Sequence, residues 1–311
     1  QTIQRLWSIA SKLRTERMRA GSLNLESAEI KILVDSKGEP EKILSSENDE
    51  SHQLVEEFML LANETVAKHI RNKKLKGIFR VHPEPELENL DELRTFVALF
   101  GISCGELTSR KEINKLLFNI IAPLGQVLRI KFLRSMKQAC YRETPDGHYG
   151  LAKRDYLHFT SPIRRYSDLV VHRTIEDWLH KEKRKAKESQ ESLAKHLSVT
   201  ERNSVDAERE SVKDKLLLFY KRGIGQHPPV VHKAVITEIA RKGFFIELVD
   251  TMARGFVPIR TLPRELGYRI TNNGTALVGR NPKNKLKLGQ EIKVVIYQVF
   301  TSDKQLDFKL A

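Results

Sequence analysis

The sequence predicts an α+β protein in which a mostly helical part precedes a small β-barrel. Apolar residues recur at helical spacing through most of residues 1–222, whereas residues 231–310 alternate over short runs, as strands do. Between the two parts, the segment Gly223–Pro229 (GIGQHPP) interrupts both patterns and is typical of a linker. We therefore expect two domains, residues 1–222 and residues 223–311.

Helical periodicity dominates the first part. The predicted helices run to about Ala20 and then over Leu54–Ile70, Asp91–Phe100, Asn114–Lys137, Pro162–His180 and Ser192–Lys221. An extended stretch near Leu23–Val34 is followed by a turn at Asp35–Gly38. The charge run Lys181–Lys187 (KEKRKAK) separates the last two helices, and we expect it to be a solvated loop or helix end.

The second part is predicted to consist of short strands. They cover Val231–Ile239, Gly243–Leu248, Gly255–Ile259, Thr275–Val278, Glu291–Val299 and Gln305–Leu310. A small domain built from strands of this length is typical of a closed barrel of the OB type.

The charge balance favours a polyanionic partner. The chain has 54 Lys and Arg against 40 Asp and Glu, a net charge of +14, and half of this excess lies in residues 223–311. Such a positive balance indicates nucleic acid as the partner in preference to a membrane surface. No apolar run reaches the length of about 20 residues that a membrane span needs. Gln1–Arg5 lacks a signal-peptide pattern, and Cys104 and Cys140 are too few for a disulfide scaffold. We therefore expect an intracellular protein, in the cytoplasm or an organelle matrix.

The most informative stretch is His158–Arg173 (HFTSPIRRYSDLVVHR). Ser161 and Pro162 predict a helix start, because serine is favoured as the cap and proline at the first helical position. Arg164 and Arg165 would then lie in the first turn, where the helix dipole disfavours cations. A phosphate bound between the two guanidinium groups and the free backbone N–H groups would remove this conflict. Pairing of both arginines with carboxylates elsewhere is an equally open alternative.

With this stretch the chain resembles the ribonuclease II/ribonuclease R family of exoribonucleases. The resemblance extends over Leu54–Ala67, Phe79–His82, Leu133–Ala139, His148–Ala152 and Ala207–Glu210. The barrel resembles the RNA-binding domain named after ribosomal protein S-one. The resemblance implies that residues 1–222 are the mostly helical C-terminal part of a ribonuclease II-type catalytic domain, followed by an OB-fold RNA-binding domain.

The resemblance also implies an activity and a site. The family degrades single-stranded RNA processively from its 3′ end to nucleoside 5′-monophosphates, with magnesium bound to an aspartate cluster. Arg164 matches the catalytic arginine at the scissile phosphate. The residues expected to contact RNA in this domain are Glu57, His158, Thr160, Ser161, Arg165, Tyr166 and Glu208. Without the resemblance, Glu57 and Glu208 could equally be ordinary carboxylates on helix surfaces.

The aspartate cluster of the family has no match in this sequence. Asp35, Asp49, Asp91, Asp146 and Asp155 are isolated, whereas two-metal chemistry needs several carboxylates that converge on the ions. We therefore expect no metal ligands in this chain and expect the magnesium ligands in an upstream segment of the same enzyme or in a second polypeptide. The alternative is a non-catalytic RNA-binding or scaffold protein with a degenerate nuclease domain.

A second departure lies at Leu25, where the family often has an aromatic residue that closes a stack of bases. Stacking on an aromatic ring is worth about 1–3 kcal/mol per base. The leucine therefore predicts a looser grip on the terminal nucleotides and their earlier release.

The barrel is expected to present basic and aromatic side chains to RNA. It has Pro258 where the related RNA-binding domains have a histidine, but it keeps other suitable groups. The residues expected to bind single-stranded RNA are Arg241, Lys242, Phe244, Phe245 and Phe256. Because small barrels use alternate phenylalanines as core, we expect at least one of Phe244 and Phe245 to be buried, and the other to stack.

Two further patterns involve Asp168. His158, Ser161 and Asp168 could suggest a hydrolase triad, but no nucleophile elbow or oxyanion motif accompanies them, so we predict none. Asp168 and His172 are four residues apart on one predicted helix, and we expect them to form a local pair.

Overall fold

The computed structural model describes residues 1–23, 29–46, 48–119, 124–182 and 188–311. Its helices are α1 (Thr2–Arg19), α2 (Glu50–Asn72), α3 (Leu87–Ala98), α4 (Arg110–Asn119), α5 (Leu124–Ser135), α6 (Tyr166–His180) and α7 (Gln190–Lys221). Leu25 and most of the charge run Lys181–Lys187 lie outside the described residues. Within the described part of the chain, no helix is both long and apolar enough to cross a membrane.

The predicted helices are confirmed with one correction, since the helix predicted to begin at Ser161-Pro162 begins instead at Tyr166. The span Asn114–Lys137 is described as α4 up to Asn119 and as α5 from Leu124 to Ser135, and residues 120–123 lie outside the described part of the chain. The start of α2 follows from local chemistry, because the Asp49 carboxylate caps the helix by accepting the N–H groups of Ser51 and His52.

A long hairpin follows α1. Its strands are β1 (Glu29–Val34) and β2 (Pro40–Ser46), paired antiparallel, and only the first was predicted as extended. The predicted turn is confirmed, since the Asp35 carboxylate accepts the N–H groups of Lys37 and Glu39 and Gly38 has φ +77°. Two short strands, β3 (Phe79–Val81) and β4 (Cys140–Arg142), also pair antiparallel inside the helical part.

The C-terminal barrel is closed, as predicted. Its strands are β5 (His232–Ala240), β6 (Gly243–Leu248), β7 (Arg254–Pro258), β11 (Glu291–Phe300) and β12 (Gln305–Leu310), in the order β11-β12-β7-β6-β5. The short 3-10 turns Ile259–Thr261 and Arg264–Leu266 follow β7. The predicted strand Thr275–Val278 exists as β9 (Ala276–Val278), but it pairs with β8 (Arg269–Ile270) and β10 (Lys285–Lys287) in a separate sheet.

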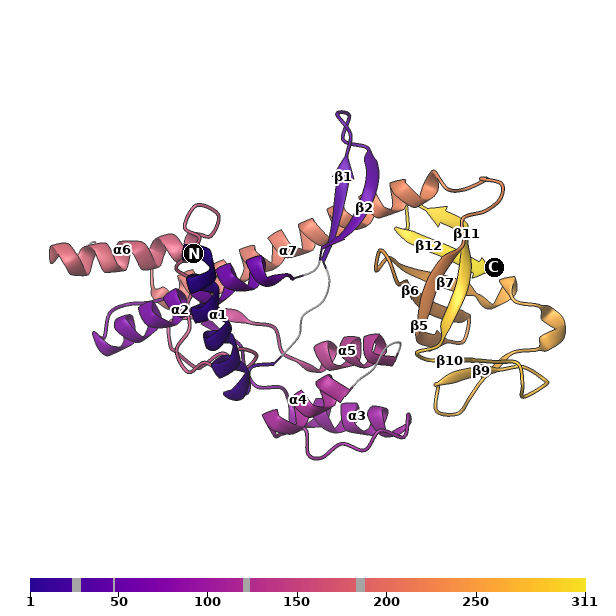
Figure 1. Cartoon of the computed structure of the whole chain (residues 1–311), viewed down its shortest axis with the longest axis horizontal. Coiled ribbons are helices and arrows are strands. Elements are labelled where there is room, and N and C mark those ends of the chain that lie inside the picture. The colour runs from indigo at the N-terminus through magenta and orange to yellow at the C-terminus, as the bar shows by residue number, and fades with distance from the viewer. Residues whose placement is uncertain (24–28, 47, 120–123, 183–187) are drawn as a thin grey trace.

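Helix α7 connects the two parts of the molecule. Figure 1 shows it running from the other helices to the barrel, with the β1–β2 hairpin beside it. Near its C-terminal end, Leu217 and Tyr220 belong to the same buried cluster as Phe244 and Phe308 of the barrel. The hairpin is held against this end because Arg222 donates to the Pro40 carbonyl at 2.7 Å. The last turns of α7 therefore pack with the barrel, and the domain boundary at residues 222 and 223 stays a prediction.

Candidate functional site

The segment Ser161–Arg165, which we call the Arg164 turn, lies directly before α6. The N–H groups of Arg164 and Arg165 donate to the Ser161 carbonyl at 3.3 and 3.0 Å, so the chain makes a tight turn there. Arg165 is extended (φ −124°, ψ 115°) and forms the N-cap position of α6. The predicted helix start at Ser161-Pro162 is wrong because a serine–proline pair initiates turns as well as helices.

The buried carboxylate of Asp168 holds this turn in place. It accepts the Ser161 N–H at 2.8 Å, and Arg165 donates to it twice, through Nε and Nη2, both at 2.9 Å. The hydroxyl of Ser167 donates to the same carboxylate at 3.1 Å. The predicted Asp168–His172 pair is wrong, because these partners occupy Asp168 and His172 instead contacts the Phe159 carbonyl at 2.9 Å.

The two arginines of the turn have different surroundings. Arg165 is held by Asp168, and only 22% of its side chain is exposed. Arg164 is exposed, and its guanidinium makes no hydrogen bond or ion pair with any described residue. Its neighbour Ile163 is also fully exposed. Arg164 is thus the arginine of the turn that remains available to an anion.

Two hydroxyl-bearing residues flank the arginines. The Thr160 hydroxyl oxygen is buried and has no hydrogen-bond partner among the described residues. The Tyr166 ring is about half exposed, and the Arg173 guanidinium lies over it at 5.8 Å from the ring centre. The turn therefore offers an unused hydroxyl and an exposed aromatic ring beside Arg164.

Behind the turn, His158 is largely covered by other side chains. Its Nδ1 lies 2.9 Å from the Tyr141 hydroxyl oxygen, and the Ser167 hydroxyl oxygen lies 3.1 Å from that same oxygen. Burial lowers the pKa of His158 to about 2, and the positive charges of Arg165 and Arg80 act in the same direction. The imidazole is therefore neutral and supports the turn by packing and hydrogen bonding.

The ring of His158 ends a series of edge-to-face aromatic contacts. Tyr156 lies 5.9 Å from it, His148 lies 5.3 Å from Tyr156, and His82 lies 5.2 Å from His148. His82 Nδ1 accepts the Gly150 N–H at 3.0 Å, and its Nε2 lies 2.8 Å from the Lys137 carbonyl. Sequence reasoning missed this ring series, whose histidines lie within the segments that carry the family resemblance but far apart along the chain.

Helix α2 ties the ring series to the turn. The Asn63 amide group donates to the Tyr156 hydroxyl at 3.1 Å, and its oxygen accepts the Phe159 N–H at 3.0 Å. Asn63 is buried, so these bonds are shielded from water. The loop that carries the predicted site residues is therefore anchored at several points before it reaches Arg164.

The two glutamates that were expected near RNA differ in exposure. Glu57 is only 2% exposed, and Arg17 of α1 donates to its carboxylate through Nε at 3.0 Å and Nη2 at 2.5 Å. It is therefore neither a helix-surface carboxylate nor an open group, and it joins α1 to α2. Glu208 is exposed on α7, as a surface carboxylate would be.

On the barrel, one of the two adjacent phenylalanines is core, as expected. Phe244 is fully buried, so its assignment to RNA contact is wrong, because a ring enclosed by the barrel cannot stack on a base. Phe245 is partly exposed and lies 5.0 Å from the ring of Phe256, with the Arg254 guanidinium 5.9 Å from its ring centre. Arg241 and Lys242 are exposed in the turn between β5 and β6.

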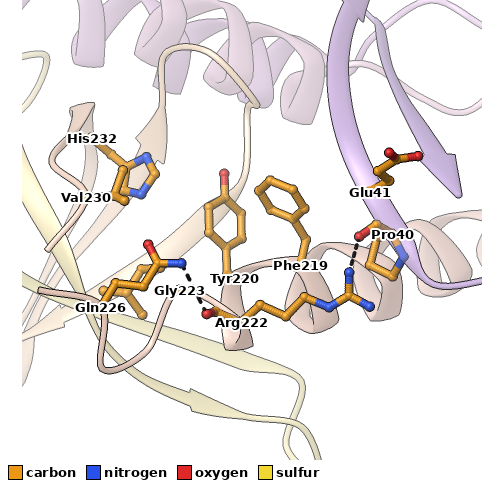
Figure 2. A pocket seen from close by; sticks show the side chains of 10 residues that line it. Pro40, Glu41, Phe219, Tyr220, Arg222, Gly223, Gln226, Val230 and His232 are labelled. Carbon is orange, nitrogen blue, oxygen red and sulfur yellow. Dashed lines mark hydrogen bonds between the residues drawn. The ribbon is translucent and has the colours of Figure 1, made fainter. Parts of the chain in front are cut away.

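A separate cavity of about 270 Å³ lies where the hairpin, the end of α7 and the barrel meet. Figure 2 shows Phe219, Tyr220 and His232 around it, with the Arg222 guanidinium bonded to the Pro40 carbonyl. None of the sequence-predicted site residues is among its described lining residues. The cavity is therefore distinct from the Arg164 turn.

The family resemblance implies magnesium, and the described residues can be tested against it. In residues 1–23, 29–46, 48–119, 124–182 and 188–311, no group of three or more His, Cys, Asp or Glu side chains is placed to hold a metal ion. Magnesium is bound through carboxylates and substrate phosphates. The described part of this chain therefore does not fit a magnesium site.

Comparison with known protein families accounts for most of the chain. The RNB domain matches residues 1–181, and the S1 RNA-binding domain matches residues 230–310. The chain belongs to the RNB-domain family. The Arg164 turn lies within the RNB match, and Phe245, Phe256 and Arg254 lie within the S1 match.

Relatives of this RNB–S1 chain are similar over nearly its whole length. It is 35% identical to ribonuclease R 1 of Lactococcus lactis over 96% of the chain and 37% of that protein. The apo structure of Mycoplasma genitalium RNase R matches with a TM-score of 0.87 and 25% identity, over 99% of this chain and 49% of that one. The chain thus spans less than half the length of these relatives. Yeast Ssd1, described as a pseudonuclease, has the same fold at 18% identity, with a TM-score of 0.62 over 96% of this chain and 36% of that one.

Proposed function

We propose that this chain belongs to a 3′→5′ exoribonuclease that hydrolyses single-stranded RNA processively to nucleoside 5′-monophosphates. The observation that carries the proposal is the Arg164 turn, where an exposed arginine without a described partner stands on a backbone held by buried Asp168. The similarity to ribonuclease R proteins supports the same activity. A related M. genitalium RNase R has been solved in complex with single-stranded RNA, which supports RNA as the substrate.

In this proposal Arg164 stabilises the transition state. Its planar guanidinium can hold two oxygens of the scissile phosphate at once, and it meets the negative charge that develops during hydrolysis. Thr160, Ser161 and Arg165 line the same turn and would contact neighbouring phosphates, with the unused Thr160 hydroxyl as a donor. The half-exposed Tyr166 offers a ring to a base, and Glu208 faces solvent on α7.

The magnesium ligands are proposed to come from outside this chain. The described residues do not fit a magnesium site, so we assign no step of the reaction to a metal bound by them. An aspartate-bearing segment, in the same protein or in a second polypeptide, would be the partner that completes the site. An intracellular location, in which RNA is the available polyanion, remains part of the same proposal.

The test of the catalytic role is the substitution Arg164→Ala in the full-length protein. Removing one preorganised donor to a transition-state charge slows hydrolysis by about a hundredfold or more. We expect this loss in single-turnover rates on 5′-labelled single-stranded RNA, with a much smaller loss of RNA affinity. Arg94→Ala is the matched control, because Arg94 is an exposed arginine on α3 whose partner among the described residues is the exposed Asp91. Near-wild-type turnover of the Arg164 variant would refute the role.

The proposed reaction is tested by a degradation time course. The labelled RNA is incubated with magnesium or with a chelator, and the products are separated by length and by nucleotide chemistry. Chelator-sensitive release of nucleoside 5′-monophosphates, with long RNA disappearing before intermediates accumulate, is the expected result. Release of nucleosides or of internal fragments would contradict the proposed products.

A non-catalytic RNA-binding protein is the second candidate function. One observation favours it: the described residues provide no metal site. The Arg164 turn weighs against it, because a protein that only binds RNA has no need for an arginine directed at a scissile phosphate. RNA binding without any magnesium-dependent shortening by the full-length protein would favour this second function.

A further inference from the structure

The barrel and helix α5 are joined through one shared carboxylate. Glu238 of β5 lies between Arg134, in the last turn of α5, and Arg254 at the start of β7. Its Oε2 atom is 3.5 Å from Arg134 Nη1 and 3.8 Å from Arg254 Nη2. The three side chains are all about half exposed, so water and solutes reach them. The Glu238 carboxylate is therefore shared by two guanidinium groups from different parts of the molecule.

These side chains line a groove of about 150 Å³ between α5 and the barrel. Lys131 adds a third positive charge to the groove lining, which also includes apolar side chains such as Val127, Ile130, Ile239 and Leu288. Thr237 also lines the groove, and its buried hydroxyl oxygen has no hydrogen-bond partner among the described residues. The groove thus holds an excess of positive charge and an unused hydroxyl.

Arg254, which lines the groove, also contacts an aromatic pair of the barrel. Arg254 reaches over the ring of Phe245, which in turn contacts Phe256. Guanidinium groups beside exposed rings are suited to single-stranded RNA, since the cations take the phosphates and the rings take the bases. An acidic peptide would use the cations but would have no need of the paired rings, so the arrangement favours RNA.

We propose that this groove binds a phosphate of single-stranded RNA and that Glu238 is the internal competitor that the phosphate displaces. The inference rests on the proposed function only in taking RNA as the ligand. Exposed ion pairs are weak and exchange readily, whereas a phosphate can engage both guanidinium groups with its own oxygens. In free protein Glu238 keeps Arg134 and Arg254 in position, and in the RNA complex the strand takes its place on both.

The test compares two glutamate variants of the full-length protein. Glu238→Gln removes the competitor, and Glu265→Gln removes the same charge from an exposed barrel site where no hydrogen bond or ion pair links Glu265 to a described residue. The affinity for a fluorescein-labelled oligouridylate is measured by anisotropy, with a chelator present so that no RNA is degraded. We expect Glu238→Gln to tighten binding about three- to fivefold beyond the Glu265→Gln control. We also expect it to steepen the salt dependence by up to about 0.7 in log–log slope.

Variants of the two arginines complete the design. Arg134→Ala and Arg254→Ala are each expected to weaken RNA binding. When either is combined with Glu238→Gln, most of the increase in affinity caused by Glu238→Gln should disappear. Equal behaviour of the two glutamate variants overturns the inference. Weaker binding by Glu238→Gln together with a lower melting temperature also overturns it, because Glu238 would then only join α5 to the barrel. Since binding is measured without hydrolysis, failure of the proposed catalysis leaves these results unchanged.

Discussion

The buried Asp168–Arg165 pair gives the sharpest prediction of stability. Asp168→Asn keeps the size of the side chain but removes its charge, and it places an amide group where Ser161 and Arg165 both donate hydrogen bonds. Breaking a buried ion pair by removing one partner costs about 3–5 kcal/mol. Because 22% of the Arg165 side chain is exposed, water recovers part of its hydration. We therefore expect the lower end, a loss of about 3 kcal/mol in the free energy of unfolding.

The structure contains a matched control for this experiment. Asp91 and Arg94 form a pair with the same sequence separation of three residues, but their side chains are 70% and 49% exposed. An exposed pair of this kind contributes about 0–1 kcal/mol, so Asp91→Asn should barely change stability. Urea unfolding followed by circular dichroism compares the two variants with the parent chain. If Asp168→Asn costs no more than Asp91→Asn, the reasoning about the buried carboxylate is wrong.

The same substitution links stability to the proposed activity. Asp168 binds Ser161 and Arg165 rather than Arg164, so it acts by positioning the turn that carries Arg164. Asp168→Asn should therefore reduce kcat more than it changes RNA affinity. Combined with Arg164→Ala it should cause little further loss, because residues that act as a unit have non-additive effects. A fully additive double variant would show that Asp168 and Arg164 act separately.

Two further predictions concern the barrel and the buried rings. Phe244→Ala should cost about 3–5 kcal/mol of stability, because it empties a core position. Phe245→Ala should leave stability unchanged and weaken RNA binding by about 1–3 kcal/mol. The prediction is contradicted if thermal melts and RNA-binding anisotropy do not distinguish the two variants. Burial holds the pKa of His148 at about 3 and that of His158 at about 2, below the ordinary value of 6.5. At a pH between the folded and the ordinary value, each histidine therefore binds a proton in the unfolded chain but not in the folded chain. The free energy of unfolding should therefore fall as the pH drops from 7 to 5, by up to about 2 kcal/mol for each histidine. The dependence of the melting temperature on pH across this range should be weaker in His148→Gln than in the parent chain and unchanged in the exposed control His180→Gln. A melting temperature of the parent chain that does not change with pH would refute the assignment.

Regular elements were predictable where the pattern repeats along the chain. The strands of the barrel alternate, so the strand Gly243–Leu248 was predictable, and Phe244, Ile246 and Leu248 all belong to one core. The sequence alone left open which of Phe244 and Phe245 is buried. The start of α6 was not predictable in this way. Ser161 and Pro162 suit a helix start and a turn equally, and the choice depends on the Asp168 carboxylate, which binds the Ser161 N–H from seven residues away.

The candidate site was predictable in its residues more than in their roles. The conflict of two cations near a helix start left two outcomes open, a bound anion or pairing of both arginines with protein carboxylates, and the structure shows carboxylate pairing for one of the two arginines. Arg165 has its carboxylate, and Arg164 remains without a described partner. The ring series through His82, His148 and His158 depends on contacts between distant segments, which no local pattern in the sequence encodes.

The electrostatics around the turn explain why Arg164 in particular suits a phosphate. Arg80 lies over the Tyr141 ring but is paired with Glu201 of α7, and Arg165 is paired with Asp168. The histidine behind the turn is neutral because burial lowers its pKa to about 2. Within the described residues, the charge at the turn that the protein leaves unmatched is therefore that of Arg164. A phosphate binds most favourably to a guanidinium that does not first have to break an ion pair with a carboxylate. The backbone that carries the Arg164 guanidinium is already held in position.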